Sequence, residues 1–151
     1  MIISTKGRYA LRILLDLAEH PAGEYIPMKE IAARQELSLK YLERIVPLLS
    51  RKGLVEGVHG KGGGYRLGVE PENCSLWQVL MLTEGDLAPV SCLECDAKPC
   101  ERSASCKTLP VWKELDKRIR EYLQSVSLAD LLSSADKRRC LFYRKYESLV
   151  F

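Results

Sequence analysis

One run of residues constrains the fold of this chain more than any other: His59-Gly60-Lys61-Gly62-Gly63-Gly64. It is too rich in glycine to hold regular structure, and it separates two short segments, Leu54–Val58 and Tyr65–Leu67, which resemble β-strands. The run therefore predicts the tip of a β-hairpin. A phosphate-binding loop is the rival interpretation. The sequence lacks the Lys-Ser or Lys-Thr ending and the strand-to-helix context that such a loop needs.

Three segments with helical periodicity precede this hairpin. The first covers residues 4–20, and a short second helix begins at Pro27. Ser38 is a good N-cap for a third helix, which runs to about Lys52. Pro47 lies inside the third helix, where it removes a backbone hydrogen bond and could cause a kink. The order helix, short helix, helix, hairpin is that of a winged helix-turn-helix.

The second half of the chain predicts further helices on either side of a long irregular segment. Ser75 caps the first of them, residues 85–107 lose all periodicity, and a long helix follows over 109–126. A loop of that length is unusual in a compact domain unless something orders it. The predicted fold class is mainly α with a small β-hairpin wing: a winged helix-turn-helix plus a long C-terminal dimerisation helix.

The long helix suggests how the chain assembles. Its apolar face is too extensive for one small domain to cover, so we expect it to pack against its symmetry mate in a homodimer. The interface residues expected on this face are Trp112, Leu115, Ile119 and Leu123. The resulting division is a winged helix-turn-helix domain (1–72), a connecting helix and cysteine-rich loop (73–108), a dimerisation helix and terminal helix (109–132), and a tail without an assigned role (133–151).

Charge and composition exclude some classes of protein. The net charge of +3 is too small to indicate a nucleic-acid partner by itself, although basic residues cluster around the hairpin. No stretch approaches the ~18–20 apolar residues of a membrane helix, and no signal peptide is evident, so we expect a cytoplasmic protein. Only His20 and His59 are present, and neither has an evident catalytic companion, so we do not expect an enzyme.

The helix-turn-helix pattern assigns candidate DNA contacts, because the N-terminal residues of the second helix of such a motif face the base edges of the major groove. These residues are Ser38, Lys40, Tyr41, Glu43 and Arg44. The hairpin would carry His59, Gly60 and Lys61 to the neighbouring minor groove or phosphates. Lys6, Arg8 and Arg12 on the first helix are candidates for phosphate contacts. Double-stranded DNA with a palindromic operator is the expected partner of a twofold dimer.

Four of the six cysteines fall between Cys92 and Cys106. In a reducing compartment such clusters are more often metal ligands or redox sensors than structural disulfides. Zinc is one alternative, although only Cys92 and Cys95 form the close pair that zinc motifs favour. A thiol–disulfide switch is another. Cys74 and Cys140 are interpreted as ordinary small residues.

Several segments resemble one known family. They are STKGRYALRILLDLA (4–18), LSLKYLERI (37–45), LSRKGLV (49–55) and GKGGGYRLG (60–68). Together they resemble the IscR-type iron–sulfur cluster regulators, in the winged-helix family that also includes NsrR, RirA and CymR. The similarity runs from residue 2 to about 132.

The resemblance implies a transcription repressor whose DNA affinity is controlled by an iron–sulfur cluster and whose targets are the genes for cluster assembly. The cluster would be 2Fe-2S by preference, or 4Fe-4S, and could be lost in aerobic preparation. Cys92, Cys100 and Cys106 best match the three cysteine ligands of the family. Cluster-assembly proteins are further expected partners. The alternatives are a cluster-free repressor of cysteine and sulfur metabolism that senses thiols or a partner, and a nitric-oxide-sensing repressor.

The sequence departs from the IscR pattern at the fourth ligand. Leu109 occupies the position of a histidine ligand and cannot bind a metal. Cys95 could supply the fourth ligand, as could the partner subunit, an exchangeable ligand or water. Glu94 and Asp96 are weaker oxygen donors to consider. Arg8 stands where NsrR-like proteins offer a carboxylate, which disfavours their arrangement.

Overall fold

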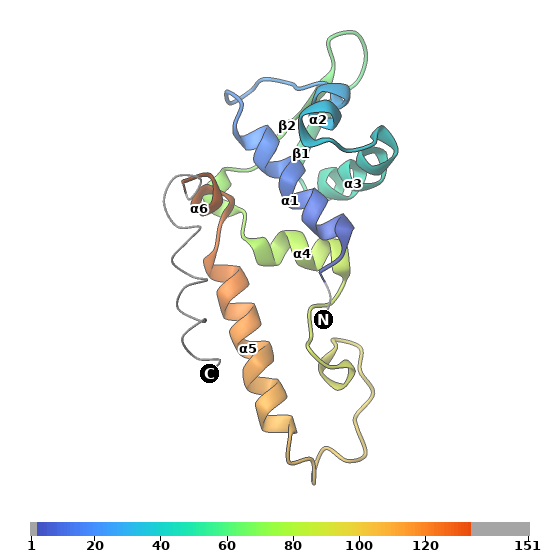
Figure 1. Cartoon of the computed structure of the whole chain (residues 1–151), viewed down its shortest axis with the longest axis vertical. Coiled ribbons are helices and arrows are strands. Elements are labelled where there is room, and N and C mark those ends of the chain that lie inside the picture. Colours follow the sequence, from blue (N-terminus) through green and yellow to red (C-terminus); the bar gives the residue numbers. More distant parts are fainter. Residues whose placement is uncertain (1–2, 134–151) are drawn as a thin grey trace, which may run out of the picture.

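The computed structural model describes residues 3–133, and the predicted tail with Cys140 lies outside them. Its first half contains α1 (Thr5–Ala18), α2 (Met28–Gln35), α3 (Leu39–Arg51), β1 (Val55–Val58) and β2 (Gly64–Leu67). This order confirms the predicted winged helix-turn-helix. In Figure 1, α1 crosses the centre of the fold, with α2, α3 and the hairpin on one side of it and α4 on the other. α1 ends at Ala18 and α3 at Arg51, one to two residues earlier than the sequence predicts.

A single apolar core joins these elements. Each helix turns its apolar stripe inward, as the helical period requires. The largest fully buried side chains of this core include Ile13, Leu14, Ile31, Leu42, Ile45 and Leu49.

The turn between α2 and α3 is tight because of one unusual backbone conformation. Glu36 adopts left-handed angles, with φ 53° and ψ 42°, and Leu37 N then donates to the Ala32 carbonyl at 2.9 Å. Such angles close a helix without adding residues. Ser38 follows as the N-cap of α3, and its hydroxyl accepts a hydrogen bond from Tyr41 N. Pro47 lies inside α3, which runs without a break from Leu39 to Arg51.

The wing is a two-stranded β-hairpin with one isolated bridge beside it. In the antiparallel register Val55 pairs with Leu67 and Val58 with Gly64, and Ile26 forms an isolated bridge to Tyr65. Gly64 has to be glycine because a Cβ there would lie 2.5 Å from the Ile26 backbone.

The second half begins with a 3₁₀ turn, η1 (Pro71–Asn73), and α4 (Leu76–Glu84), which packs against α1. A capping box between Ser75 and Gln78 begins α4. After η2 (Ser91–Leu93), α5 (Leu109–Ser125) and α6 (Leu128–Ser133) follow. Figure 1 shows α5 extending away from the winged part, with the cysteine-containing segment running beside it. Within residues 3–133, no helix is long and apolar enough to span a membrane.

Candidate nucleic-acid interface and cysteine segment

α3, the second helix of the helix-turn-helix, presents a polar face to solvent. The candidate reading residues are all exposed: Ser38, Lys40, Tyr41, Glu43 and Arg44. On the opposite face of α3, Leu42, Ile45, Val46 and Leu49 are buried. This division fixes the rotation of the helix, because turning it would expose the apolar stripe to water. The candidate DNA-contacting side chains therefore lie together on the exposed face of α3.

The wing tip is exposed at His59, Gly60 and Lys61. The glycines of the tip are required by the hairpin itself. Gly60 and Gly62 have φ of 104° and 80°, which other residues rarely adopt, and a Cβ on Gly63 would overlap the carbonyl oxygen of Val58.

One basic residue near the wing is already paired within the chain. The Arg66 guanidinium donates to the Glu56 carboxylate across the hairpin at 2.6 Å and lies 4.9 Å from the centre of the Tyr25 ring. Hydrogen bonding to Glu56, which outweighs the opposing effect of desolvation, raises the pKa of Arg66. Arg66 therefore stabilises the base of the wing.

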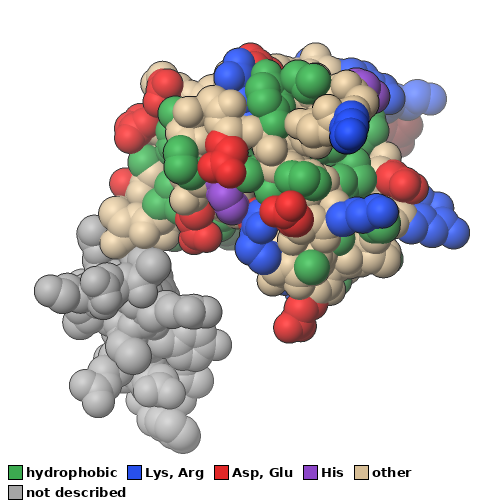
Figure 2. Space-filling view, turned by 90° about the horizontal axis from the view of Figure 1, so that it is seen from above, with side chains coloured by type: hydrophobic (Ala, Val, Ile, Leu, Met, Phe, Trp, Pro, Cys, Tyr) green, Lys and Arg blue, Asp and Glu red, His purple; other side chains and the backbone are tan. Residues whose placement is uncertain are grey.

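Basic side chains on α1 differ in how far they are engaged. Lys6, Arg8 and Arg12 are all exposed, and Arg8 makes a hydrogen bond of 3.2 Å to the Thr5 hydroxyl. The Arg12 guanidinium instead donates to Gln35 of α2 through both the side chain and the backbone carbonyl. In the end-on view of Figure 2, Lys and Arg side chains gather mainly in the right-hand part of the surface.

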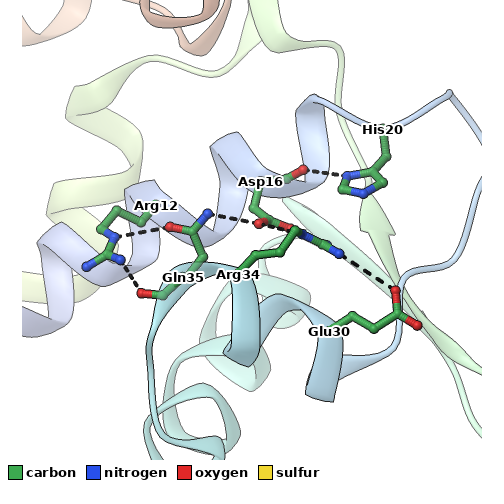
Figure 3. A network of polar contacts seen from close by, with 6 residues as sticks. All are labelled: Arg12, Asp16, His20, Glu30, Arg34 and Gln35. Carbon is green, nitrogen blue, oxygen red and sulfur yellow. Dashed lines mark hydrogen bonds and ion pairs between the residues drawn. The ribbon is translucent and has the colours of Figure 1, made fainter.

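A polar network joins α1 to α2 and was not foreseen from the sequence. The Asp16 side chain, only 2% exposed, accepts hydrogen bonds from Arg34 at 2.7 and 3.1 Å and from Gln35 at 2.8 Å. Figure 3 shows Gln35 lying between Asp16 and Arg12. Burial alone would raise the pKa of Asp16, but the hydrogen bonds from Arg34 and Gln35 outweigh it and hold this pKa below its ordinary value. The signal in the sequence is a charged residue inside the apolar run of α1.

The cysteine segment is tied to the end of α4 by Asp86. Its carboxylate accepts hydrogen bonds from the backbone N–H of Ala88 at 2.6 Å and of Cys95 at 2.8 Å. Cys92, Cys95 and Cys100 are exposed, and Cys106 is half-buried just before α5. All four are free thiols, as is Cys74, which is fully buried and raised in pKa to about 11 by that burial. The interpretation of Cys74 as a small core residue is confirmed.

Two thiols of the segment differ in acidity. Hydrogen bonds from the Thr108 hydroxyl, the Thr108 N–H and the Leu109 N–H lower the pKa of Cys106. The Asp86 carboxylate, through its hydrogen bond and its charge, raises the pKa of Cys95. Because the thiolate is the form that binds metals, Cys106 has the more suitable environment of the two.

The donor types of this segment fit an iron–sulfur cluster, since four unbonded thiols lie on one accessible stretch of chain. Their arrangement does not form a ligand set: among the described residues, no three His, Cys, Asp or Glu side chains converge on a metal site. Leu109, at the family's histidine position, is the first residue of α5.

Some apolar side chains of α5 are buried against the rest of the chain, and others are exposed to solvent. Leu123 is buried with Leu80 and Leu87, and Ile119 packs against the same cluster. Val111, Leu115 and Tyr122 are 59%, 39% and 60% exposed. Trp112 is half-buried. The predicted interface thus separates into an inner part, Ile119 and Leu123, and an outer part that includes Leu115.

A helix-turn-helix with an exposed reading face and an adjoining wing defines a winged-helix DNA-binding protein. The chain belongs to the Rrf2 family, described as iron-dependent transcriptional regulators, and the model of that family matches residues 3–134. The resemblance inferred from the sequence is confirmed.

Individual relatives agree with this assignment. The chain is 36% identical over 133 residues to the HTH-type transcriptional regulator IscR of Aliivibrio salmonicida (strain LFI1238), covering 87% of this chain and 77% of that protein. Among solved structures it is similar to CymR (YrzC), the global cysteine regulator of B. subtilis, with a TM-score of 0.73 and 36% identity over 90% of this chain and 99% of that one. It is also similar to T. potens IscR, with a TM-score of 0.69 and 34% identity. This match covers 92% of this chain and 91% of that one. The chain is therefore a transcriptional regulator of the Rrf2 type.

Proposed function

We propose that this regulator is a repressor whose affinity for DNA is set by an iron–sulfur cluster bound to the cysteine segment. The observation that carries the proposal is the set of four free thiols between α4, which packs on the DNA-binding half, and α5. Cys92, Cys100 and Cys106 would hold the cluster, and Cys95 is the proposed fourth ligand. The lowered pKa of Cys106 favours its thiolate form, whereas the raised pKa of Cys95 does not, so the fourth ligand is tested separately by the Cys95 variant below.

We further propose that the DNA-bound form is a homodimer joined along α5. Val111, Leu115 and Tyr122 recur at helical spacing and are exposed, so a second copy of the helix could cover them. Two recognition helices related by a twofold axis would match a palindromic operator. Binding of the cluster would order the segment beside α5 and shift the DNA affinity by a coupling free energy. Genes for cluster assembly are the proposed targets.

The test is anaerobic purification followed by visible spectroscopy with iron and sulfide analysis. The protein should absorb in the visible, and a variant with Cys92, Cys100 and Cys106 all replaced by Ala should not. Cys74→Ala is the matched control, because it removes a thiol that is buried outside the segment. Visible absorption and iron that persist in the triple variant would contradict the ligand assignment. Cys95→Ala alone separates a fourth ligand from a bystander.

A cluster-free repressor that senses thiol oxidation is the second candidate. The similarity to CymR and the exposure of Cys92, Cys95 and Cys100 favour it. In that case purified anaerobic protein would carry no iron. Mild peroxide would then join two of the segment's cysteines, which peptide mapping by mass spectrometry detects, and the DNA affinity would change with that disulfide.

A further inference from the structure

Arg12 is an exposed residue whose guanidinium makes three contacts within the protein. Its Nε donates to the Gln35 side-chain oxygen at 3.1 Å, and a terminal nitrogen donates to the Gln35 backbone carbonyl. The guanidinium carbon lies 5.5 Å from the centre of the Tyr9 ring. An arginine held by a side chain, a carbonyl and an aromatic face differs from Arg8, whose hydrogen bond goes to Thr5 on its own helix.

The groups that Arg12 binds lie at the turn of the helix-turn-helix. Gln35 is the last residue of α2, and carbonyl groups in the last turn of a helix have no partner within it. A guanidinium donating to that carbonyl satisfies it and also places positive charge at the negative end of the helix. The next residue, Glu36, has the left-handed backbone that redirects the chain into α3.

On the far side of the turn, Arg12 reaches the recognition helix through Tyr9. The Tyr9 and Tyr41 rings meet edge to face, with centroids 5.6 Å apart and planes at 85°. Tyr41 lies in the first turn of α3 and is 45% exposed. Such aromatic pairs have a preferred geometry, so a fixed Tyr9 favours one position of Tyr41.

The position of Gln35 is itself fixed by Asp16. The Gln35 amide nitrogen donates to the Asp16 carboxylate at 2.8 Å, while its oxygen faces Arg12 (Figure 3). The amide cannot turn over, because a carboxylate only accepts hydrogen bonds and a guanidinium only donates them. A buried charge on α1 thus orients the group that Arg12 binds.

We propose that Arg12 is a positioning residue, which clamps the turn between α2 and α3 and so sets the pose of Ser38 and Tyr41 against the DNA bases. The sequence alone had suggested that Arg12 contacts phosphate. The inference rests on α3 being the DNA-reading helix, as proposed above. The clamp depends on the shape of the guanidinium, whereas a phosphate contact depends mainly on its charge, and this difference can be measured.

The decisive variant is Arg12→Lys, which keeps the charge but cannot bind the side chain and the carbonyl of Gln35 while lying over Tyr9. Affinities are measured over a range of KCl concentrations for two duplexes. One is selected from random-sequence DNA by the unmodified protein, and the other is a shuffled duplex of the same composition. The clamp predicts that Arg12→Lys lowers the ratio of the two affinities about tenfold, comparable to losing a base contact. The shuffled affinity and the salt slope should not change.

A phosphate contact predicts different results, which would overturn the inference. Arg12→Lys would then keep both affinities, and Arg12→Gln would weaken both duplexes equally and reduce the salt slope by about 0.9. Arg118→Lys is the control, because Arg118 lies on α5 away from the candidate DNA contacts and hydrogen-bonds within its own helix, to Glu114; it should leave the ratio unchanged. Thermal unfolding of each variant, measured alongside, ensures that binding is compared among folded proteins.

Gln35→Met provides a second variant, because it removes the side-chain hydrogen bonds to Arg12 and Asp16 without changing any charge, while the backbone carbonyl of residue 35 can still accept from Arg12. The clamp predicts that it lowers the affinity ratio in the same direction as Arg12→Lys, and that the loss in the double variant is smaller than the sum of the two single losses. Additive losses would overturn the clamp. If the unmodified protein itself does not prefer any selected duplex, the proposed DNA-reading function fails, and the clamp fails with it.

Discussion

Replacing Asp16 with Asn tests whether the polar network between α1 and α2 stabilises the fold. Asn has the shape of Asp but no charge, and it presents an NH₂ group where both oxygens now accept. In the native protein those oxygens accept hydrogen bonds from Arg34 at 2.7 and 3.1 Å and from Gln35 at 2.8 Å. The oxygen of an Asn side chain could still accept from one of these donors. Its NH₂ group would face another donor and could not bond to it.

The expected cost follows from burial. Removing one member of a fully buried ion pair costs about 3–5 kcal/mol, because the other charge is left unpaired. Here the Asp16 side chain is 2% exposed but that of Arg34 is 38% exposed, so Arg34 can turn toward water. Allowing for that screening, we expect Asp16→Asn to lower the free energy of unfolding by about 2 kcal/mol. The midpoint of thermal unfolding should fall by roughly 6 °C.

The same network predicts how this cost depends on pH. The folded-state pKa of Asp16 is lowered, so its contribution is fully present above the unfolded-state pKa of about 3.9 and is lost as pH falls through the folded value. Urea unfolding of the reduced apoprotein, at one fixed concentration, should therefore give a constant difference between native protein and Asp16→Asn from pH 5 to 8. Below about pH 4 the two stabilities should converge.

Two results would refute this reasoning. One is a difference in unfolding free energy below about 0.5 kcal/mol at neutral pH. The other is a difference that persists undiminished to pH 3. Glu30→Gln is the matched control, because Glu30 pairs with the same Arg34 at 3.6 Å from a side chain that is 58% exposed. That variant should be close to native in stability.

Three further predictions concern the wing, the dimer and the thiols. Gly64→Ala should lower the unfolding free energy by about 2 kcal/mol, because the added methyl meets the Ile26 backbone; urea titration measures this, and a neutral result would contradict the packing described for the wing. Leu115→Glu should convert a dimer to a monomer in light scattering with an unchanged far-ultraviolet spectrum, and a persistent dimer would show that α5 does not join the subunits. In the apoprotein at pH 7, Cys106 should react with iodoacetamide faster than Cys95, because the pKa of the first is lowered and that of the second raised; peptide mapping that finds the opposite order would refute these environments.

Features with a local cause could be predicted from the sequence. Ser38 caps α3 because its hydroxyl accepts a hydrogen bond from the backbone N–H of Tyr41, only three residues further along the chain. The helical period alone separates buried Leu42 from exposed Tyr41. The glycine run around Gly62 indicated the hairpin tip, since few other residues adopt its backbone angles. The close spacing of four cysteines was enough to predict a site in their segment.

Features that depend on partners distant in sequence could not be predicted. Asp16 stands out as a charge among buried leucines, but its partners Arg34 and Gln35 lie 18 and 19 residues away on another helix. The same holds for Arg12, which resembles any other exposed basic residue until Gln35 of α2 is placed beside it. Periodicity also could not divide the apolar face of α5, because only the packing against Leu80 and Leu87 covers Leu123.

The junction between α4 and α1 shows how the cysteine segment is connected to the DNA-binding half. The segment begins at Gly85, directly after Glu84, whose carboxylate accepts a hydrogen bond of 2.8 Å from the hydroxyl of Ser4, the N-cap of α1. A side chain on Gly7 would overlap the same carboxylate, so the two helices are in close contact here. Gly7 lies next to Lys6 and Arg8, the candidate phosphate contacts. A rearrangement of the segment that moves the end of α4 would therefore shift or break this contact, and with it the hydrogen bond to the N-cap of α1.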